Sequence, residues 1–244
     1  MSTKSRNGIL NVSKIIGLQF SVLSPDEIRN SSVAEITSRD TYIANKPVIG
    51  GLFDPRMGIL DPGLICPTDG LNYMKTPGYF GHINLARPVF YIQYLNTILK
   101  VLRSICFKCG KLLINKEKHL HILKKDNRAR WSYVFSQASK IMRCGDECED
   151  GCGCKQPKKI YKDGLATIFA EWDNTNKIAN EVGEVKDKLT IKVLPEMVIK
   201  LFSRISNDDV HFMGFSSIWF RPEWFVFQVL AIPPPAVRPS VKQD

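Results

Sequence analysis

Cys106-Phe107-Lys108-Cys109-Gly110-Lys111-Leu112 is the stretch on which the rest of the chain depends. Two cysteines three positions apart can bind one metal ion, and the glycine permits the tight turn in which backbone N–H groups face the sulfurs. Further cysteines follow about 35 to 45 residues downstream, and two of them would complete a tetrahedral site: Cys144, Cys148, Cys152 and Cys154. The pattern predicts a structural zinc site that fastens a sizeable insertion. Disulfide bonds and unrelated buried thiols are the alternatives.

The length and composition are those of an ordinary globular protein. The 244 residues suffice for one large domain or two small ones. No apolar run approaches the roughly 18 residues needed to span a bilayer, and the start of the chain, Met1–Asn7, lacks the apolar core of a signal peptide. We therefore expect an intracellular protein in a reducing compartment, where clustered cysteines favour metal binding over disulfide bonds.

The positive charge is concentrated in one segment. The net charge is +10, and the segment from Lys100 to Lys162 carries sixteen Lys and Arg against six Asp and Glu, a surplus of ten. Since the chain has 34 basic and 24 acidic residues, the remainder has eighteen of each and is neutral. Such a focused surplus is typical of a surface for a polyanion, most simply nucleic acid. The alternative is a solvated, lysine-rich face.

The densest basic cluster supplies the candidate nucleic-acid-binding residues: Lys124, Lys125, Arg128 and Arg130. Contacts to phosphate require only positive charge in the right place, so they are independent of base sequence and weaken with salt. We expect no catalytic residue in the chain. The carboxylate run at residues 146–150 stands beside cysteines in a loop and is interpreted as a solvated acidic turn.

The periodicity of the sequence predicts an α+β fold that is irregular and rich in loops. Helices are expected where apolar residues recur at three- and four-residue steps or where capping residues stand, at 24–32, 88–106, 131–142 and 195–205. Strands are expected at 16–23, 161–172, 190–194 and 225–232, and a polyproline II segment at 233–239. A polar hairpin or loop is expected at 174–187, and turn signals from Gly, Pro and Asp fill residues 45–79.

Six motifs occur in the order found in one known family. They are GGLFDPRMG at 50–58, PGYFGHINLARPVF at 77–90, CFKCGKLL at 106–113, KDGL at 162–165, RPEW at 221–224 and PPPAVRPS at 233–240. Together they resemble the N-terminal clamp region of the largest subunit of multisubunit DNA-directed RNA polymerases, with the polymerase II type most similar. The resemblance extends over residues 15–244.

The resemblance implies a function and a set of partners. The family's clamp is a mobile element that closes over template DNA and the RNA–DNA hybrid during transcription. It works with the second-largest subunit, smaller polymerase subunits, and initiation and elongation factors. The enzyme is a nucleotidyltransferase, but its catalytic aspartate motif, which holds Mg²⁺, is absent from these 244 residues. The alternative function is that of a free-standing, zinc-stabilised nucleic-acid-binding transcription regulator.

The sequence and the resemblance together imply a domain plan. A flexible N-terminus is expected at residues 1–15, and a clamp-type domain at 16–232 that contains the basic, zinc-bearing insertion at 100–162. Residues 233–244 would form a polyproline connector to a catalytic part outside the chain.

The zinc ligands implied by the family pattern are Cys106, Cys109, Cys144 and Cys152. Cys148 and Cys154 are additional cysteines, and either could replace the third or fourth ligand. Four cysteines predict a closed, structural site, whereas a metalloenzyme requires an open coordination position.

The family's second, upstream zinc site has lost most of its ligands in this sequence. Cys66 remains, but Asp69, Thr76 and Tyr79 stand at the other ligand positions, so we expect this site to be free of metal. Packing of Tyr79 and Phe80 would then hold the loop. The loss favours a divergent enzyme such as that of a large DNA virus, located in the virion or the host cytoplasm. A cellular enzyme would be located in the nucleus.

Overall fold

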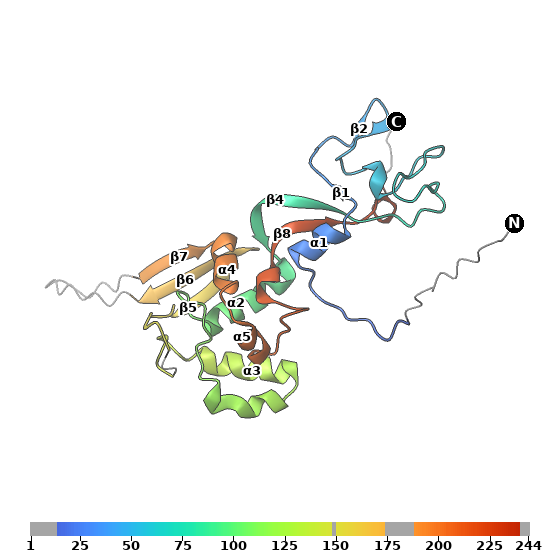
Figure 1. Ribbon diagram of the computed structural model, residues 1–244. Coiled ribbons are helices and arrows are strands. Elements are labelled where there is room, and N and C mark those ends of the chain that lie inside the picture. Colours follow the sequence, from blue (N-terminus) through green and yellow to red (C-terminus); the bar gives the residue numbers. More distant parts are fainter. Residues whose placement is uncertain (1–13, 148–149, 174–187, 240–244) are drawn as a thin grey trace, which may run out of the picture.

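The structure is a computed structural model that describes residues 14–147, 150–173 and 188–239 (Figure 1). It has mixed helices and short strands with many loops, as the sequence predicts. Five α-helices lie within the described ranges: α1 (Pro25–Ser31), α2 (Leu95–Ser104), α3 (Asn127–Ala138), α4 (Pro195–Phe202) and α5 (Asn207–Phe212). Short 3-10 helices occur at Pro55–Met57, Ile92–Tyr94, Glu117–Lys124, Pro222–Phe225 and Pro235–Val237.

A ribbon of two long strands joins the two ends of the molecule (Figure 1). Strand β4 (Gly81–Phe90) pairs with the antiparallel strand β8 (Val226–Ile232), and the short strand β1 (Ala34–Glu35) adds a parallel edge to β4. The register of the pairing between β4 and β8 shifts between Asn84 and Val89, where the ladder is irregular. Helix α1 lies beside this ribbon (Figure 1).

Helix α1 begins where the sequence predicts. The Oγ of Ser24 accepts a hydrogen bond from the backbone N–H of Glu27 (3.1 Å), and the Glu27 carboxylate accepts one from the N–H of Ser24 (2.8 Å). This reciprocal pair satisfies two N–H groups that a helix start leaves without partners, and Pro25 fits the first turn.

The expected helix over 88–106 is shorter than predicted and starts at Leu95. Val89 and Phe90 instead pair with Phe227 and Val226 of β8, which lies far away in the sequence. Tertiary pairing overrides the helical periodicity here, and a 3-10 turn at Ile92–Tyr94 makes the transition to α2.

The main hydrophobic core lies at the end that contains the cysteines. Helix α2 buries Leu95, Ile98, Val101 and Leu102, and the core continues through α4, α5 and the aromatic residues around Phe225. The expected helix at 131–142 is observed four residues earlier, as α3, because Asp126 caps its start by accepting a hydrogen bond from the N–H of Ala129. The helix expected at 195–205 is observed as α4, which begins at Pro195 as predicted and ends at Phe202.

A second sheet covers one side of this core. It is an antiparallel meander of β5 (Lys159–Asp163), β6 (Thr167–Asp173) and β7 (Lys188–Val193) (Figure 1). Ile168, Ala170 and Val193 are buried, so one face of the sheet lines the core. The strands predicted at 190–194 and 225–232 are confirmed, and the one predicted at 161–172 is a hairpin of two strands.

The opposite end of the molecule is loop-rich and has a small core of its own. Ala34, Ile36, Met57 and Ile232 form it. Beside it the hairpin of β2 (Tyr42–Ile43) and β3 (Lys46–Pro47) projects into solvent (Figure 1).

The carboxylate of Asp54 organises the loops at this end. Asp54 is 0% exposed and accepts hydrogen bonds from the N–H of Gly50 (2.6 Å), from the N–H of Arg56 (2.9 Å) and from the Arg56 guanidinium (2.7 and 3.0 Å). Burial by itself raises the pKa of Asp54, but these donors outweigh burial and the pKa is lowered.

Two further predicted segments differ from the structure. Residues 16–23 form no strand; Ile16 is 98% and Phe20 85% exposed, because the segment has no partner strand among the described residues. The predicted polyproline segment at 233–239 contains a 3-10 turn at Pro235–Val237, which Arg238 fastens by donating a hydrogen bond to the Pro233 carbonyl (2.9 Å). The expectations for 1–13, 174–187 and 240–244 lie outside the described residues.

The Asp54 cluster generates a stability prediction. Asp54→Asn should lower the free energy of unfolding by about 2 kcal/mol at pH 7, because a buried carboxylate loses hydrogen bonds to charged and backbone donors. The pKa of Asp54 is lower in the folded than in the unfolded chain, so its contribution is present above the unfolded pKa and is lost as the pH falls through the folded pKa. Urea unfolding at pH 7 and at acid pH should therefore give a difference that shrinks in acid.

Asp26→Asn is the matched control for this prediction. The Asp26 side chain is 88% exposed and pairs only with Arg29 on the same helix, so its replacement should change stability by less than about 0.5 kcal/mol. A loss at Asp54 that is equally large at both pH values would contradict the assignment.

Candidate metal centre

The first two cysteines are held by a turn that follows α2. The N–H of Cys106 donates to the carbonyl of Lys111 (2.8 Å), and the N–H of Gly110 donates back to the carbonyl of Cys106 (2.9 Å). Gly110 has a positive φ of 77°, and a Cβ there would lie 2.8 Å from the Cβ of Arg204. Only glycine therefore allows this turn to pack against the end of α4.

The second two cysteines are held by a loop that follows α3. The N–H of Cys144 donates to the carbonyl of Cys154 (3.0 Å), so the two limbs of the loop run side by side. Gly145 and Gly151 cross within it, and a Cβ on Gly151 would lie 2.1 Å from the Cα of Gly145. This close approach brings Cys152 next to the first turn.

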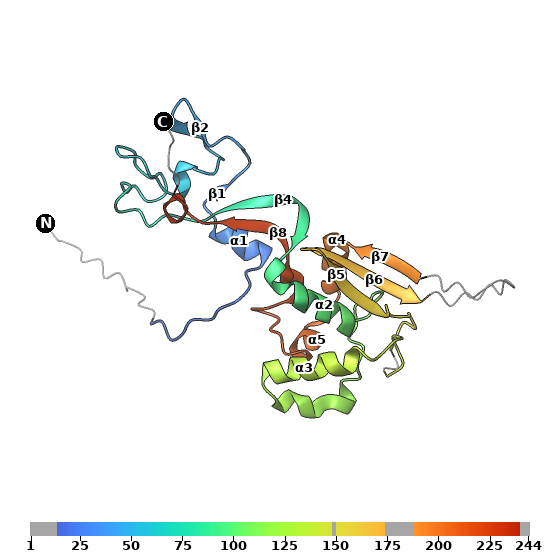
Figure 2. The ribbon, with the colours of Figure 1, turned by 180° about the vertical axis from the view of Figure 1, so that it is seen from behind.

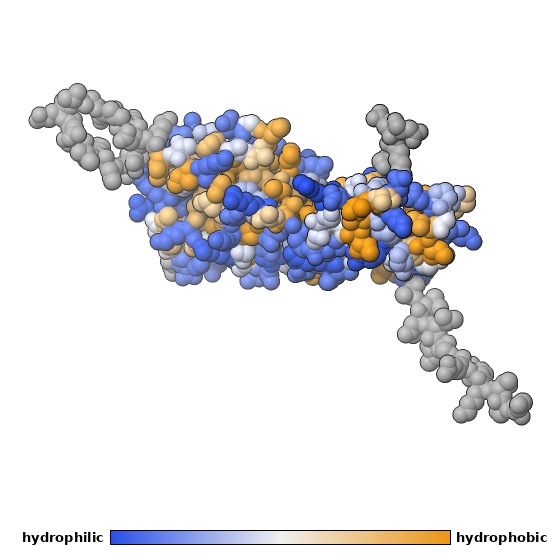
Figure 3. Space-filling view, turned by 90° about the horizontal axis from the view of Figure 1, so that it is seen from above, coloured by the Kyte–Doolittle hydropathy of each residue, from blue (hydrophilic) through white to orange (hydrophobic). Residues whose placement is uncertain are grey.

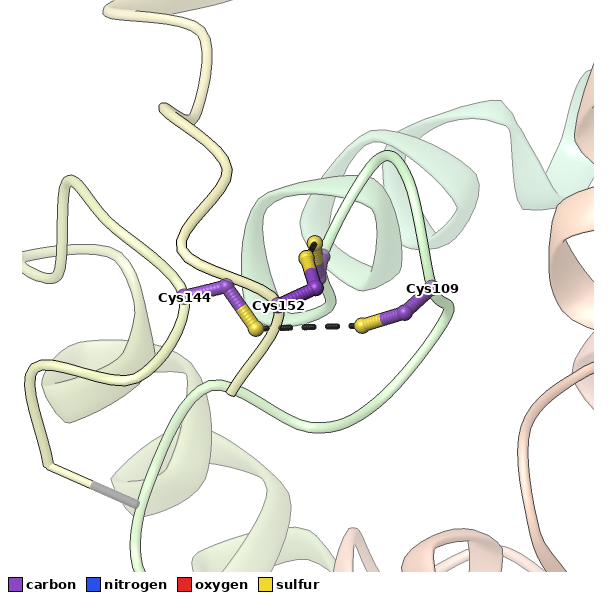
Figure 4. Close-up of side chains that lie close together, drawn as sticks. Cys109, Cys144 and Cys152 are labelled. Carbon is purple, nitrogen blue, oxygen red and sulfur yellow. Dashed lines mark hydrogen bonds between the residues drawn. The ribbon is translucent and has the colours of Figure 1, made fainter. Parts of the chain in front are cut away.

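The four sulfurs converge on one point. The Sγ atoms of Cys106, Cys109, Cys144 and Cys152 all lie within 4.8 Å of one another. Those of Cys106 and Cys152 are 3.5 Å apart, and those of Cys109 and Cys144 are 3.7 Å apart. Figure 4 shows Cys109 and Cys144 pointing toward each other from separate loops, with Cys152 beside them. These are the four residues that the sequence predicted as ligands, and together they could hold a metal ion.

The two additional cysteines have different outcomes. The thiol of Cys154 is outside the cluster of four and lies 3.7 Å from the carbonyl oxygen of Lys155. Cys148, the other predicted alternative ligand, lies outside the described residues.

Gln156 is a part of the site that the sequence did not reveal. Its side chain is 5% exposed, and its Nε2 donates to the Sγ of Cys106 (3.2 Å) and to the carbonyl of Cys154 (2.9 Å). Its Oε1 accepts a hydrogen bond from the N–H of Phe107 (3.0 Å). One buried amide thus orients a ligand sulfur and joins the two loops, and groups of this kind tune metal sites. A glutamine carries no motif of its own, so no spacing could have identified it.

The protein environment prepares one thiol for deprotonation. Burial raises the pKa of Cys106, but the backbone N–H groups of Cys109 and Lys108 and the side chains of Cys152 and Gln156 outweigh it and lower the pKa to about 7. Burial, together with the neighbouring thiols, raises the pKa of Cys109 and of Cys144. A metal cation would favour the thiolate form at every ligand, so metal binding releases protons and weakens in acid.

The residues predicted to bind nucleic acid lie, in the sequence, between Cys109 and Cys144. Lys124, Lys125 and Arg128 are exposed where the 3-10 helix Glu117–Lys124 meets α3, at one edge of the molecule (Figure 2). The ammonium group of Lys125 lies 5.2 Å from the centre of the Tyr133 ring. Lys124 and Arg128 form no ion pair with any residue in the described part of the chain.

Arg130 occupies a different position from its neighbours in sequence. It is 6% exposed, and its guanidinium donates to the carbonyl of His211 (3.2 Å) and to the side chain of Asn127 (2.5 Å). Arg130 therefore fastens α3 to α5 and is unavailable to phosphate in this conformation. An ion pair between Lys116 and the buried Asp209 (2.7 Å) makes a second connection to α5.

Comparison with known proteins agrees with the resemblance seen in the motifs. Residues 12–244 match the family model described as RNA polymerase Rpb1, domain 1. The chain is 36% identical over 241 residues to the DNA-directed RNA polymerase subunit Rpo1N of Methanocaldococcus jannaschii. That alignment covers 94% of this chain and 16% of the archaeal protein, so the chain spans a minor part of its relative's length.

Replacing Gln156 should weaken metal binding without changing the ligands. Gln156→Ala is expected to lower metal affinity about 10- to 100-fold, because the Cys106 sulfur loses a donor and the two loops lose a connection. Competition with a chromophoric chelator measures the change. Gln137→Ala on α3, whose amide bonds only the adjacent Ser136, should leave affinity unchanged. Equal affinities of all three proteins would exclude an orienting role for Gln156.

Adding one methyl group where Gly145 and Gly151 cross should destabilise the site more than replacing Gln156 does. Gly151→Ala is expected to destabilise the chain by at least about 2 kcal/mol and to reduce retained metal, because the new Cβ overlaps backbone atoms that cannot move aside cheaply. Thermal unfolding and elemental analysis report the two effects. Gly17→Ala, where no atom lies within 4 Å of an added Cβ, is the control and should behave like the unaltered chain.

Proposed function

The chain belongs to the family of the N-terminal part of the largest subunit of DNA-directed RNA polymerase, and we propose that it forms the enzyme's clamp. The proposed clamp closes over template DNA and the RNA–DNA hybrid during transcription. The observation that carries the proposal is the family match over residues 12–244. A free-standing, zinc-stabilised transcription regulator is not favoured, because the similarity to a polymerase subunit extends over nearly the whole chain.

The ion that suits the four-cysteine site is zinc. Four thiolates about 2.3 Å from a tetrahedral ion have sulfurs about 3.8 Å apart. The two pairs at 3.5 and 3.7 Å are close to that separation, and Cys106 and Cys144 are buried. Tetrahedral four-sulfur sites select zinc or iron–sulfur chemistry, and a site closed by four protein ligands is structural. Bound zinc would contribute folding free energy at this site and no chemical step.

Nucleic acid is the partner proposed for the exposed basic residues Lys124, Lys125 and Arg128. They stand on a segment that is fixed to the main core by the Lys116–Asp209 ion pair and by Arg130. A fixed array of positive charges suits contact with phosphates along any template sequence. Arg130 is no longer part of the proposed contact set.

Catalysis is proposed to occur elsewhere in the complete subunit. The catalytic aspartate motif is absent from these 244 residues, so nucleotidyl transfer with Mg²⁺ would use a part of the largest subunit outside this chain. We propose residues 16–232 as the clamp unit, 100–162 as its zinc-bearing insertion and 233–244 as the connector.

Other polymerase subunits are the proposed protein partners, together with initiation and elongation factors. Large apolar side chains are exposed at both ends of the face seen from above (Figure 3). Exposed apolar groups of this kind mark contacts in larger assemblies, of which the second-largest subunit is the first candidate. In the part of the chain that the structure describes, no helix has the length and apolarity to cross a bilayer. The proposed location is intracellular: nuclear for a cellular enzyme, virion or host cytoplasm for a viral one.

The nucleic-acid proposal predicts a specific salt dependence. Affinity for duplex DNA should fall steeply with salt, vary little with base sequence, and show a log–log slope that drops by about 3 in the variant Lys124→Gln/Lys125→Gln/Arg128→Gln. Fluorescence anisotropy at several salt concentrations measures the slope. The variant Arg39→Gln/Lys46→Gln/Lys75→Gln removes the same charge from exposed positions at the loop-rich end and should keep the original slope. The same decrease of the slope in both variants would mean that DNA affinity depends on the net charge of the chain and not on these three residues.

A further inference from the structure

A second loop repeats the backbone of the cysteine turn. In the turn at 105–112, Ile105 and Leu112 form an isolated β-bridge. The N–H of Cys106 donates to the carbonyl of Lys111 (2.8 Å), and that of Gly110 donates to Cys106 (2.9 Å). These two opposed hydrogen bonds close the turn. The residue before its glycine is Cys109, whose sulfur belongs to the four-cysteine cluster.

The loop at 65–72 has the same arrangement forty positions earlier. Ile65 and Asn72 form the β-bridge. The N–H of Cys66 donates to the carbonyl of Leu71 (2.9 Å), and that of Gly70 donates to Cys66 (2.8 Å). Gly70 has a positive φ of 70°, against 77° for the glycine of the first turn. The backbone of this loop therefore matches that of the cysteine turn at 105–112.

The side chains of this loop are unsuited to a metal ion of the zinc type. At the position of the second cysteine stands Asp69, and the nearby polar groups are the hydroxyls of Thr76 and Tyr79, which are poor zinc ligands. Cys66 is 0% exposed, and its sulfur lies 3.6 Å from the carbonyl oxygen of Pro55. Among the described residues, the only group of three or more metal-binding side chains is the four-cysteine cluster.

The carboxylate of Asp69 accepts several hydrogen bonds within the loop. The Oδ1 of Asp69 accepts the N–H of Leu71 (2.9 Å), and its Oδ2 accepts the hydroxyls of Thr76 (2.7 Å) and Tyr79 (3.1 Å). These donors come from both limbs of the loop, so the carboxylate joins them as a central ion would. Phe80, which was expected to help by packing, is 51% exposed and contributes little.

We propose that residues 65–79 form a loop closed by the Asp69 carboxylate and its hydroxyl donors instead of by an ion, so that the side chains present do not fit the zinc ion of the family's upstream site. The loop fastens the segment before it: the N–H of Tyr79 donates to the carbonyl of Met57 (2.8 Å), and the hydroxyl of Thr68 donates to that of Arg56 (2.5 Å). The loop thereby supports the small core around Met57.

The protonation of Asp69 is consistent with this role. Burial raises its pKa, but the N–H of Leu71 and the side chains of Thr76, Cys66 and Tyr79 outweigh burial and lower it. The titratable groups facing the carboxylate are Cys66 and Tyr79, and burial and the bond to Asp69 raise the pKa of Tyr79. The carboxylate accepts and the phenol donates at neutral pH, as the geometry requires.

The first test uses the unaltered chain. Elemental analysis should return about one zinc per chain, and Cys66→Ser should leave that number unchanged. On addition of a strong chelator, the amide protons of Gly110 and Lys111 should lose protection from hydrogen exchange, while those of Gly70 and Leu71 keep theirs. Two zinc ions per chain, or a loss of protection in both loops, would overturn the proposal.

The second test converts the loop. The variant Asp69→Cys/Thr76→Cys/Tyr79→His places three additional zinc ligands around Cys66, and metal content should rise from about one to about two ions per chain. Asp69→Asn, which keeps the size of the side chain and removes its charge, should stay at one ion and lose protection at Gly70 and Leu71. A converted chain that keeps the helical circular dichroism of the unaltered protein but holds one ion would show that the backbone, and not the side chains present, excludes the ion.

Discussion

The convergence of four sulfurs from two loops is the constraint on which the cysteine-bearing end of the molecule depends. Cys106 and Cys109 follow α2, whereas Cys144 and Cys152 follow α3, so their meeting closes the whole basic segment into one large loop. The ion pair and the buried arginine that attach this segment to α5 then fix its orientation. The exposed basic residues are therefore held in place both by the cysteine cluster at the base of the loop and by these two attachments to α5.

Much of the fold was predictable from local chemistry, and the two largest errors have one physical origin. The capping box at Ser24 and the proline start of α4 are local signals, and both elements begin where predicted. The helix over 88–106 and the strand over 16–23 were predicted from periodicity, but strand formation depends on a partner far away in the sequence. Val89 and Phe90 have such a partner in β8, whereas residues 16–23 have none among the described residues.

The metal site was predictable where its residues belong to a motif with a recognisable spacing. The four clustered cysteines are those that the family pattern indicated. Gln156 was missed because a buried amide acts through its position alone and belongs to no motif. Arg130 was predicted to be a surface residue because its charge does not reveal that it lies on the side of the helix that faces the core. Its neighbour Arg128 has the same chemistry and remains exposed. Burial decides between these roles, and burial is a property of the folded chain.

The register shift in the β4–β8 ribbon has a mechanical consequence. A paired two-stranded ribbon cannot lengthen, because extended backbone is already at its full reach, but it bends where the ladder is irregular. The register shift between Asn84 and Val89 lies between the two hydrophobic cores. A displacement of the cysteine-bearing end would therefore reach the loop-rich end as a rotation about these residues. Bending at these residues would change the angle between the two ends and would leave the length of the ribbon between them unchanged.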